Sequence, residues 1–496
     1  MDYIQGFDRS QLVMLSFEDN VSADSWARVV DWFVDALPMQ DMGFKEILAE
    51  EGRPPYKSSD LLKLLMYGYK NQLRSSRKLA AACHINIEVM WLMRGLRPSA
   101  RKIAYFRKEN PDAFRQSFRY FVQTLKEWDL IDGRTIAIDS FKIRAQNSLK
   151  NNFNQKKIDR HLEYIDKKIS EYEQQLDNED SQDEQSNEDV TQKLNQQHQR
   201  RKEYKAIEKE LHESGEHQLS KTDPDAKAVV LHRNVVNVGY NVQAGTDSKH
   251  KLFINNNTGT VNDTHALADM ALDAKALLEV EQINCITDKG YTTGVHIDTC
   301  MKNNIITYSS PKHHSSAHNG LYNMNEFIYD AQNDTYTCPA NQVLYTNGKI
   351  CKKRIHKVKR YYTKACKACA IREKCTQNKM GRFIERSIYQ EALEENEKRV
   401  QSNPDYYRQR QQITEHQFGT LKRQWGFTYT LMRGKENVLS EVNLLMSCYN
   451  LHRLMSILGL ETLKSYLKEL WINLLKLYKP FTILLKPFRL EYQLCY

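Results

Sequence analysis

Two short stretches decide the fold: TIAID, from Thr135 to Asp139, and INCITD, from Ile283 to Asp288. Each is apolar, has the length of one strand and ends on a carboxylate, which predicts two β-strands that carry an acid at their ends. Between them, residues 228–261 read AVVLHRNVVNVGYNVQAGTD and then KLFINNNTGTV after a short break. Apolar residues recur there with a period of two, so two or three adjacent strands are predicted.

Helical spacing returns over His265–Leu278 and near Val295–Met301, and a last apolar strand follows at Ile305–Ser309. The predicted order is therefore three strands, a helix, a strand, a helix and a strand. Acids end the first and the fourth strand. This is the order of a ribonuclease H-like core, so an α/β fold of that type is expected.

Helical patterns occupy the chain before and within this core. Up to about Trp128, apolar residues recur at spacings of three and four. The segment 58–95 reads as three helices, with Arg74, Arg77 and Lys78 at the turn and first exposed face of the second, where a helix-turn-helix contacts DNA. An ordinary three-helix bundle with a solvated basic edge explains the same pattern.

A second helical region follows the first core strand. From Ile158 to Leu176 apolar residues repeat at alternating spacings of four and three, which predicts a coiled coil. The run from Asp177 to Asp189 holds seven acids and no base, so a solvated loop is expected there. Helical spacing restarts from Leu194 to Leu211, which completes an inserted antiparallel hairpin that serves as a spacer or a protein-contact arm.

Composition sets the class of protein. The chain has 496 residues, 41% of them hydrophobic and 27% charged, with a formal charge of +10. This excludes a disordered chain or a small disulfide scaffold, allows about three domains, and favours polyanionic partners weakly. The N-terminus MDYIQGFDRS shows no signal peptide, which predicts a cytoplasmic protein. The apolar C-terminal tail is interrupted by Lys and Pro, so it reads as an amphipathic helix and no membrane partner is expected.

The acids at the two strand ends suggest metal-dependent chemistry on a phosphodiester. Three carboxylates can hold two Mg²⁺ or Mn²⁺ ions, which activate the attacking oxygen and stabilise the leaving one. The candidates are Asp139, Asp288 and Glu415. Arg410, Lys422 and Arg423 share the predicted helix of Glu415 and would neutralise nearby phosphates.

Five of the ten cysteines lie within 38 residues, which suggests a structural zinc site. The four chosen ligands are Cys338, Cys366, Cys369 and Cys375, and Cys351 is the spare. Reduced packing thiols remain the alternative. The run from Lys352 to Arg360 holds six cations in nine residues, which either follow a DNA backbone or form a solvated ribbon edge.

Three segments resemble the signature regions of DDE transposases of bacterial insertion sequences, in the branch with a cysteine-bearing insertion before the final Glu. They are IAIDSFKIRA around Asp139, CITDKGY around Asp288 and YYRQRQQITEHQFGTLKRQWGF around Glu415. The resemblance runs from about Gly52 to Gly459. In the wider family the last motif has three residues between its Arg and its Glu. This chain has four, between Arg410 and Glu415.

The resemblance implies a transposase that cuts at the terminal inverted repeats of its element and joins the freed 3′-hydroxyls to target DNA. Asp139, Asp288 and Glu415 would ligate metal in both steps. Tyr407, Arg410 and Lys422 would contact phosphates, and Trp425 would stack on an extruded base unless it is a core residue. A homodimer on paired double-stranded DNA ends and a nucleoid-associated location are implied as well. A non-cutting DNA-binding descendant and a nuclease without strand transfer are the competing functions.

These expectations divide the chain into seven segments. They are a helical DNA-binding region (1–130), the first part of the core (131–150), the coiled-coil hairpin (151–222), the core continued (223–312), the cysteine-rich zinc-like insertion (313–385), the final core helices with Glu415 (386–460) and the amphipathic tail (461–496).

Overall fold

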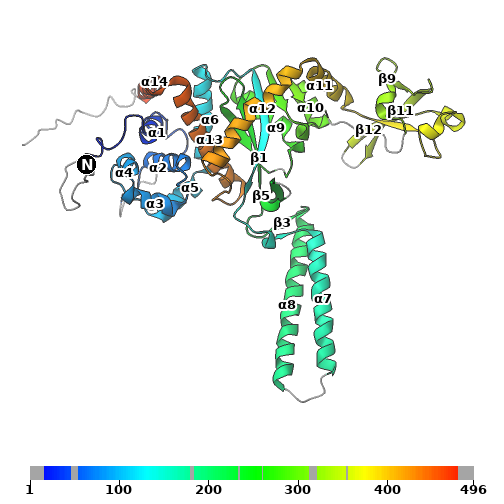
Figure 1. The fold of residues 1–496 in the computed structure, drawn as a ribbon, viewed down its shortest axis with the longest axis horizontal. Coiled ribbons are helices and arrows are strands. Elements are labelled where there is room, and N and C mark those ends of the chain that lie inside the picture. The colour runs from blue at the N-terminus through cyan, green and yellow to red at the C-terminus, as the bar shows by residue number, and fades with distance from the viewer. Residues whose placement is uncertain are drawn as a thin grey trace, which may run out of the picture.

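The computed structural model describes residues 16–45, 54–178, 184–232, 235–259, 261–311, 321–353 and 356–478. It is a mixed α/β structure. A helical N-terminal region and a central sheet form the main body, a two-helix hairpin projects from it, and a smaller sheet lies at the end opposite the N-terminal helices (Figure 1).

The N-terminal region consists of helices with local stop and start signals in the sequence. Ser75 and Ser99 cap α3 and α5, since their hydroxyls accept the backbone N–H groups of Lys78 and Lys102. The helices are α1 (Trp26–Asp35), α2 (Ser58–Lys70), α3 (Ser76–Ile85), α4 (Ile87–Leu92), α5 (Ala100–Glu109) and α6 (Pro111–Glu127).

The central sheet has the strand order β4–β5–β1–β7–β8, and β6 also pairs with β5. β1 is antiparallel to β5 and parallel to β7, and β7 is parallel to β8. The strands are β1 (Thr135–Arg144), β4 (Lys227–His232), β5 (Val235–Asp247), β6 (Phe253–Asn257), β7 (Ile283–Thr287) and β8 (Ile305–Ser309). All strands predicted for the core are present.

Helices that follow the strands pack on the sheet. α9 (Leu267–Leu277) and α10 (Gly294–Lys302) lie between strands in the chain, as predicted. α11 (Gln390–Ser402) contacts β8, and α12 (Pro404–Gly419) contacts β1, β5 and β7. The last turn after α12, Thr420–Gln424, is π-helical.

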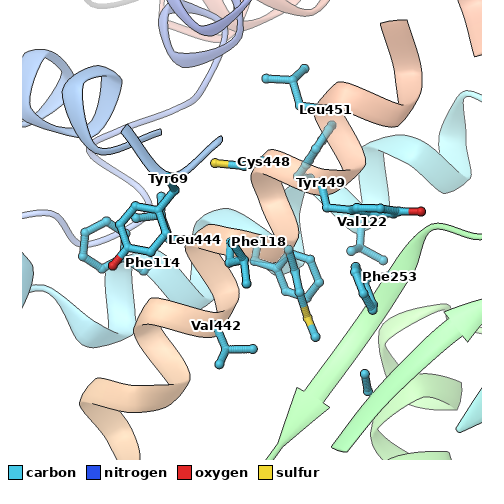
Figure 2. Close-up of a cluster of buried hydrophobic side chains, with 14 of the residues drawn as sticks. Tyr69, Phe114, Phe118, Val122, Phe253, Val442, Leu444, Cys448, Tyr449 and Leu451 are labelled. Carbon is cyan, nitrogen blue, oxygen red and sulfur yellow. The ribbon is translucent and has the colours of Figure 1, made fainter. Parts of the chain in front are cut away.

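A long helix, α13 (Lys435–Leu458), joins the N-terminal region to the sheet. It packs on α2, α6 and β6, and its side chains are buried on nearly every side from Ser440 to Leu451. Figure 2 shows this contact, with Tyr69 and Phe114 on one side of α13 and Phe253 on the other. One continuous hydrophobic core therefore spans both regions.

The projecting hairpin consists of α7 (Gln155–Asn178) and α8 (Glu184–Ser214). Ile158, Ile165 and Ile169 of the predicted seam are buried. At its base, the short strands β2 (Asn152–Phe153) and β3 (Leu219–Ser220) pair. The acidic run is only partly a loop, because α8 already begins at Glu184. Acids are favourable in the first turn of a helix, where the N–H groups are unpaired.

The smaller sheet has the strand order β13–β12–β11–β10–β9 and its own core of Phe327, Tyr336, Leu344, Tyr361 and Ile384. Its strands are β9 (Ile328–Asp330), β10 (Thr335–Thr337), β11 (Val343–Lys353), β12 (His356–Tyr362) and β13 (Phe383–Ser387).

Two further expectations concern Arg74 and the tail. The prediction that Arg74 faces DNA is wrong: its guanidinium is buried and donates to the carbonyls of Tyr429 and Gly426. The tail begins as α14 (Leu460–Tyr478), and residues 479–496 lie outside the described part of the chain. Among the described helices, none has both the length and the apolar character needed to cross a membrane.

Candidate active site

The two aspartates predicted at strand ends lie side by side, but only Asp288 follows the end of its strand. The prediction is wrong for Asp139, because β1 continues to Arg144 through its pairing with β5. β1 and β7 are parallel neighbours, and Ile138 is the register partner of Thr287, so Asp139 and Asp288 come next on adjacent strands. The two carboxyl groups are near enough that Asp288 contributes to raising the pKa of Asp139. Parallel pairing thus brings together two acids that are about 150 residues apart in the sequence.

Asp139 is held by residues of α12. Arg410 Nη1 lies 3.0 Å from Asp139 Oδ2, and the Thr414 hydroxyl donates to the same oxygen at 3.2 Å. The other oxygen, Oδ1, accepts the Ser140 backbone N–H at 2.7 Å. Burial raises the pKa of Asp139, while Ser140 and Arg410 lower it. A guanidinium therefore occupies one side of a largely buried carboxylate.

Asp288 caps the short 3₁₀ turn Lys289–Tyr291. Its Oδ1 accepts the Gly290 backbone N–H at 2.7 Å. A Cβ on Gly290 would lie 2.9 Å from Asp288 Oδ1 and 3.4 Å from Asp263 Oδ2. Glycine thus allows two carboxylates to approach the same point of the backbone.

Glu415 is not part of this cluster. It lies exposed on α12, and Thr414 is the residue that faces Asp139. Four intervening residues separate Arg410 from Glu415, and each residue turns an α-helix by about 100°, so Thr414 shares the face of Arg410 and Glu415 does not. Among the described residues, no group of three or more His, Cys, Asp or Glu side chains has metal-binding geometry.

Lys422 lies in the π-helical turn beside β1. Its Nζ is 5.8 Å from the centre of the Phe141 ring. Burial lowers the pKa of Lys422, and the neighbouring Lys142 lowers it further. Two cations, Lys142 on β1 and Lys422 beside it, thus raise the positive potential near this strand.

The remaining predicted DNA contacts are spread over three regions. Tyr407 is half-buried and packs near Ala137 and Ile286, whereas Arg423 is exposed after α12. Arg77 and Lys78 are exposed in the first turn of α3.

Trp425 belongs to the core. It is only 4% exposed and lies against Tyr449 and His452 of α13. The core alternative thus holds for Trp425, and its ring offers no face to an extruded base.

The four chosen cysteines converge in the smaller sheet. Cys338, Cys366, Cys369 and Cys375 line one narrow hollow of about 20 Å³, near Arg382. Burial raises the pKa of Cys375, Arg382 lowers it, and the other three thiols raise it. Cys351 lies on β11, opposite Val358, and does not line the hollow.

Sequence reasoning missed Thr414, Lys142 and Asp263. Thr414 was recoverable, because it lies four residues after Arg410 and such residues share a helix face. Asp263 carried no signal, since it precedes α9 in a polar turn. Its Oδ1 accepts from Asn241 and Gln243 of β5, which only the fold brings near.

Comparison with family models gives two matches. A transposase domain (DUF772) model matches residues 15–109, and a transposase DDE domain model matches residues 337–455. The second match spans the cysteine cluster and Glu415. No curated protein matches. A piggyBac transposase synaptic complex with hairpin DNA aligns with 94% of this chain and 81% of its own, at 11% identity and a TM-score of 0.29, so the fold argument rests on strand topology alone.

The N-terminal region and the segment around Glu415 thus both match transposase domains. Together, the two matches indicate a DDE-type transposase of an insertion-sequence family.

Proposed function

We propose that the chain cuts DNA at the terminal inverted repeats of its own element and joins the 3′-ends to target DNA. The observation that carries the proposal is the pair of carboxylates that parallel pairing places side by side, Asp139 within β1 and Asp288 directly after β7. Apart from β4, which also pairs with β5, the sheet has the order β6–β5–β1–β7–β8. The three strands that come first in the chain, β1, β5 and β6, pair antiparallel, and the last two, β7 and β8, run parallel to β1. This arrangement supports a ribonuclease H-like core.

The residues present fit a divalent cation. Asp139 and Asp288 offer hard oxygen donors, and Mg²⁺ in proteins is commonly held by one or two carboxylates together with substrate phosphates. Asp139 already has a cation, the Arg410 guanidinium, against its Oδ2. When bound, Mg²⁺ or Mn²⁺ would activate the attacking oxygen and stabilise the leaving one. Glu415 remains our third proposed ligand, and it would have to turn toward the aspartates when DNA and metal bind.

Cations near the aspartates would hold the DNA. Lys422, Arg423 and Arg410 lie on or just after the helix that covers Asp139, and Tyr407 is on the same helix. Arg77 and Lys78 at the start of α3 would contact double-stranded DNA farther away. We also propose a homodimer on paired ends, a cytoplasmic, nucleoid-associated location, and the domain division given above.

The test uses DNA that carries the ends of the element, found in the sequence flanking the gene. With Mg²⁺ or Mn²⁺, we expect release of labelled 3′-ends and their joining to a second DNA. Release without joining would identify a nuclease without strand transfer, and tight binding without either product would identify a non-cutting descendant. The active-site variants are considered in the Discussion.

The ion pair of Arg410 gives a prediction that separates metal binding from catalysis. Arg410→Gln removes a cation that competes with metal for Asp139. We therefore expect Mn²⁺ to bind several-fold more tightly, because the energy of a partly buried ion pair no longer opposes metal binding. Cleavage should decrease, because the proposed phosphate contact is lost. Mn²⁺ titration followed by electron paramagnetic resonance measures the first effect and the end-cleavage assay the second. Arg408→Gln, an exposed residue of the same helix, is the control. Weaker Mn²⁺ binding in Arg410→Gln would contradict the prediction.

We further propose that Cys338, Cys366, Cys369 and Cys375 bind one structural zinc ion. Their hollow has room for a single water-sized occupant, and four thiolates are a usual ligand set for structural zinc. In the described residues no three of these thiols have metal-binding geometry, so zinc would have to draw them closer together. The smaller sheet has a core of only five buried residues, so a metal crosslink would stabilise it.

The zinc proposal predicts a difference between two cysteine variants. Purified wild-type protein and Cys351→Ser should each contain one zinc per chain by elemental analysis, because Cys351 does not line the hollow. Cys375→Ser should lose the zinc and melt at a lower temperature. Zinc retained by Cys375→Ser, or absent from the wild type, would show that the thiols are packing residues.

A further inference from the structure

Three exposed aromatic rings form a row across the smaller sheet. Tyr345 of β11 is the register partner of Tyr362 of β12, and Tyr362 is the register partner of Phe383 of β13. Directly paired residues of antiparallel strands point to the same face, with Cβ atoms about 5 Å apart. The three rings therefore lie on one face, and we call them the aromatic row.

The exposure of this row is unusual for its size. Tyr345 is 61%, Tyr362 50% and Phe383 43% exposed. Their chain neighbours Leu344, Tyr361 and Ile384 point to the opposite face and form the core of the sheet. Since that face is already filled, the aromatic row contributes nothing to the buried core, and large exposed apolar patches mark binding surfaces.

The hairpin that carries two of the three rings is strongly basic. Between Val343 and Lys364 there are eight Lys and Arg and no Asp or Glu. Lys359 and Arg360 pair with Asp334 and Glu385. Arg360 shares the face of the aromatic row, and its guanidinium lies 5.4 Å from the centre of the Phe383 ring. Lys364, two residues after Tyr362, and Lys349, four residues after Tyr345, are exposed. These cations would attract a polyanion bound along the row.

A hollow adjoins the row. Tyr345, Thr346, Asn347, Tyr362, Thr363 and Lys364 line a space of about 350 Å³. This volume is at the lower end of the range for ligand pockets. Its walls combine two phenol rings, short polar side chains and one ammonium group, which suits a planar ring next to a phosphate.

We propose that the aromatic row and the cations beside it bind single-stranded DNA, with bases stacked on Tyr345 and Tyr362 and the phosphate backbone along Lys349, Arg360 and Lys364. Aromatic platforms inside a cationic groove are the common way of binding unpaired strands, because every base has a flat face. Duplex DNA fits less well, because its bases are already stacked on one another. This proposal rests on the proposed function in one respect: the single strand would come from the DNA end that the protein opens when it cuts.

The test measures binding by full-length protein without added Mg²⁺, so that no cutting occurs. Fluorescence anisotropy compares a labelled 20-nucleotide oligothymidine with a 20-base-pair duplex. Double substitution Tyr345→Ala, Tyr362→Ala should weaken binding of the oligothymidine about 30-fold or more, the effect of losing two stacked bases. Binding of the duplex should change by less than about twofold, because the phosphate contacts remain.

Three variants serve as controls. Tyr345→Phe, Tyr362→Phe keeps the rings and should bind the oligothymidine as the wild type does. Ile328→Ala removes an exposed apolar side chain from β9 of the same sheet and should have no effect. Lys349→Gln, which removes a proposed phosphate contact, should by contrast weaken the binding of both DNAs and reduce the salt dependence of that binding. An unchanged oligothymidine affinity in the Tyr→Ala variant, with its zinc content and melting temperature preserved, would overturn the inference.

The outcomes separate this proposal from the function above. If the wild type cleaves its DNA ends and the Tyr→Ala variant binds oligothymidine as tightly as the wild type, the proposed function stands and single-strand binding by the aromatic row is excluded. If the protein never cleaves its DNA ends but its oligothymidine binding depends on Tyr345 and Tyr362, single-strand binding by the aromatic row stands and the proposed function is excluded.

Discussion

Asp139→Asn is expected to lower end cleavage about a thousandfold or more. The substitution keeps the shape of the side chain but removes the charge that would hold a cation beside Asp288. A bound metal ion contributes several kcal/mol to stabilisation of the transition state, and about 1.4 kcal/mol corresponds to a factor of ten in rate. The measurement is the rate of 3′-end release from labelled element ends in Mg²⁺ and in Mn²⁺.

Matched variants make this result specific. Asp269→Asn changes an exposed acid on α9 and should cut at the wild-type rate. Asp288→Asn should be as inactive as Asp139→Asn, and both should bind the uncut ends normally. Cleavage by Asp139→Asn at more than about a tenth of the wild-type rate would contradict the assignment.

Glu415→Gln decides the role of the third acid. Loss of cleavage as large as in Asp139→Asn would mean that Glu415 turns toward the aspartates on the DNA complex. Wild-type cleavage by Glu415→Gln would mean that the exposed position of Glu415 is its working position, and that two aspartates suffice on this chain.

The second large effect is expected on stability. Glu441 of α13 is fully buried, and its carboxylate accepts from the hydroxyls of Tyr69 and Thr430 and from the Leu431 N–H. The buried guanidinium of Arg74 lies 3.5 Å away. Glu441→Gln would leave Arg74 as an uncompensated buried charge, which costs about 3–5 kcal/mol of unfolding free energy.

Calorimetry or a chemical unfolding curve measures this loss. Glu436→Gln, an exposed position in the first turn of α13, should change stability by less than about 0.5 kcal/mol. The double variant Arg74→Met, Glu441→Gln should recover part of the loss, because it removes the unpaired charge as well. Equal stability of Glu441→Gln and wild type would show that Arg74 is satisfied by the carbonyls of Gly426 and Tyr429 alone.

Much of the fold could be predicted because the signals are local. Alternation with a period of two marked the strands β4, β5 and β6, short apolar runs marked β1 and β7, and the four-three repeat from Ile158 marked α7. Where a prediction was wrong, a distant residue decided the outcome. Arg74 looks like a surface cation in its own segment, but α13 supplies Glu441 more than 350 residues later. Trp425 follows a basic stretch, yet Tyr449 and His452 enclose it.

The candidate site divides in the same way. The sequence by itself determined that Asp139 and Asp288 belong to strand segments and that four cysteines are grouped, because strand periodicity and spacing along the chain carry this information. Only the tertiary structure decided that Arg410 and Thr414 face Asp139 while Glu415 does not, that Asp263 approaches Gly290, and that three aromatic rings align across β11, β12 and β13. These arrangements depend on strand register and helix rotation. Both are set by how whole elements pack in the core, and no single segment encodes them.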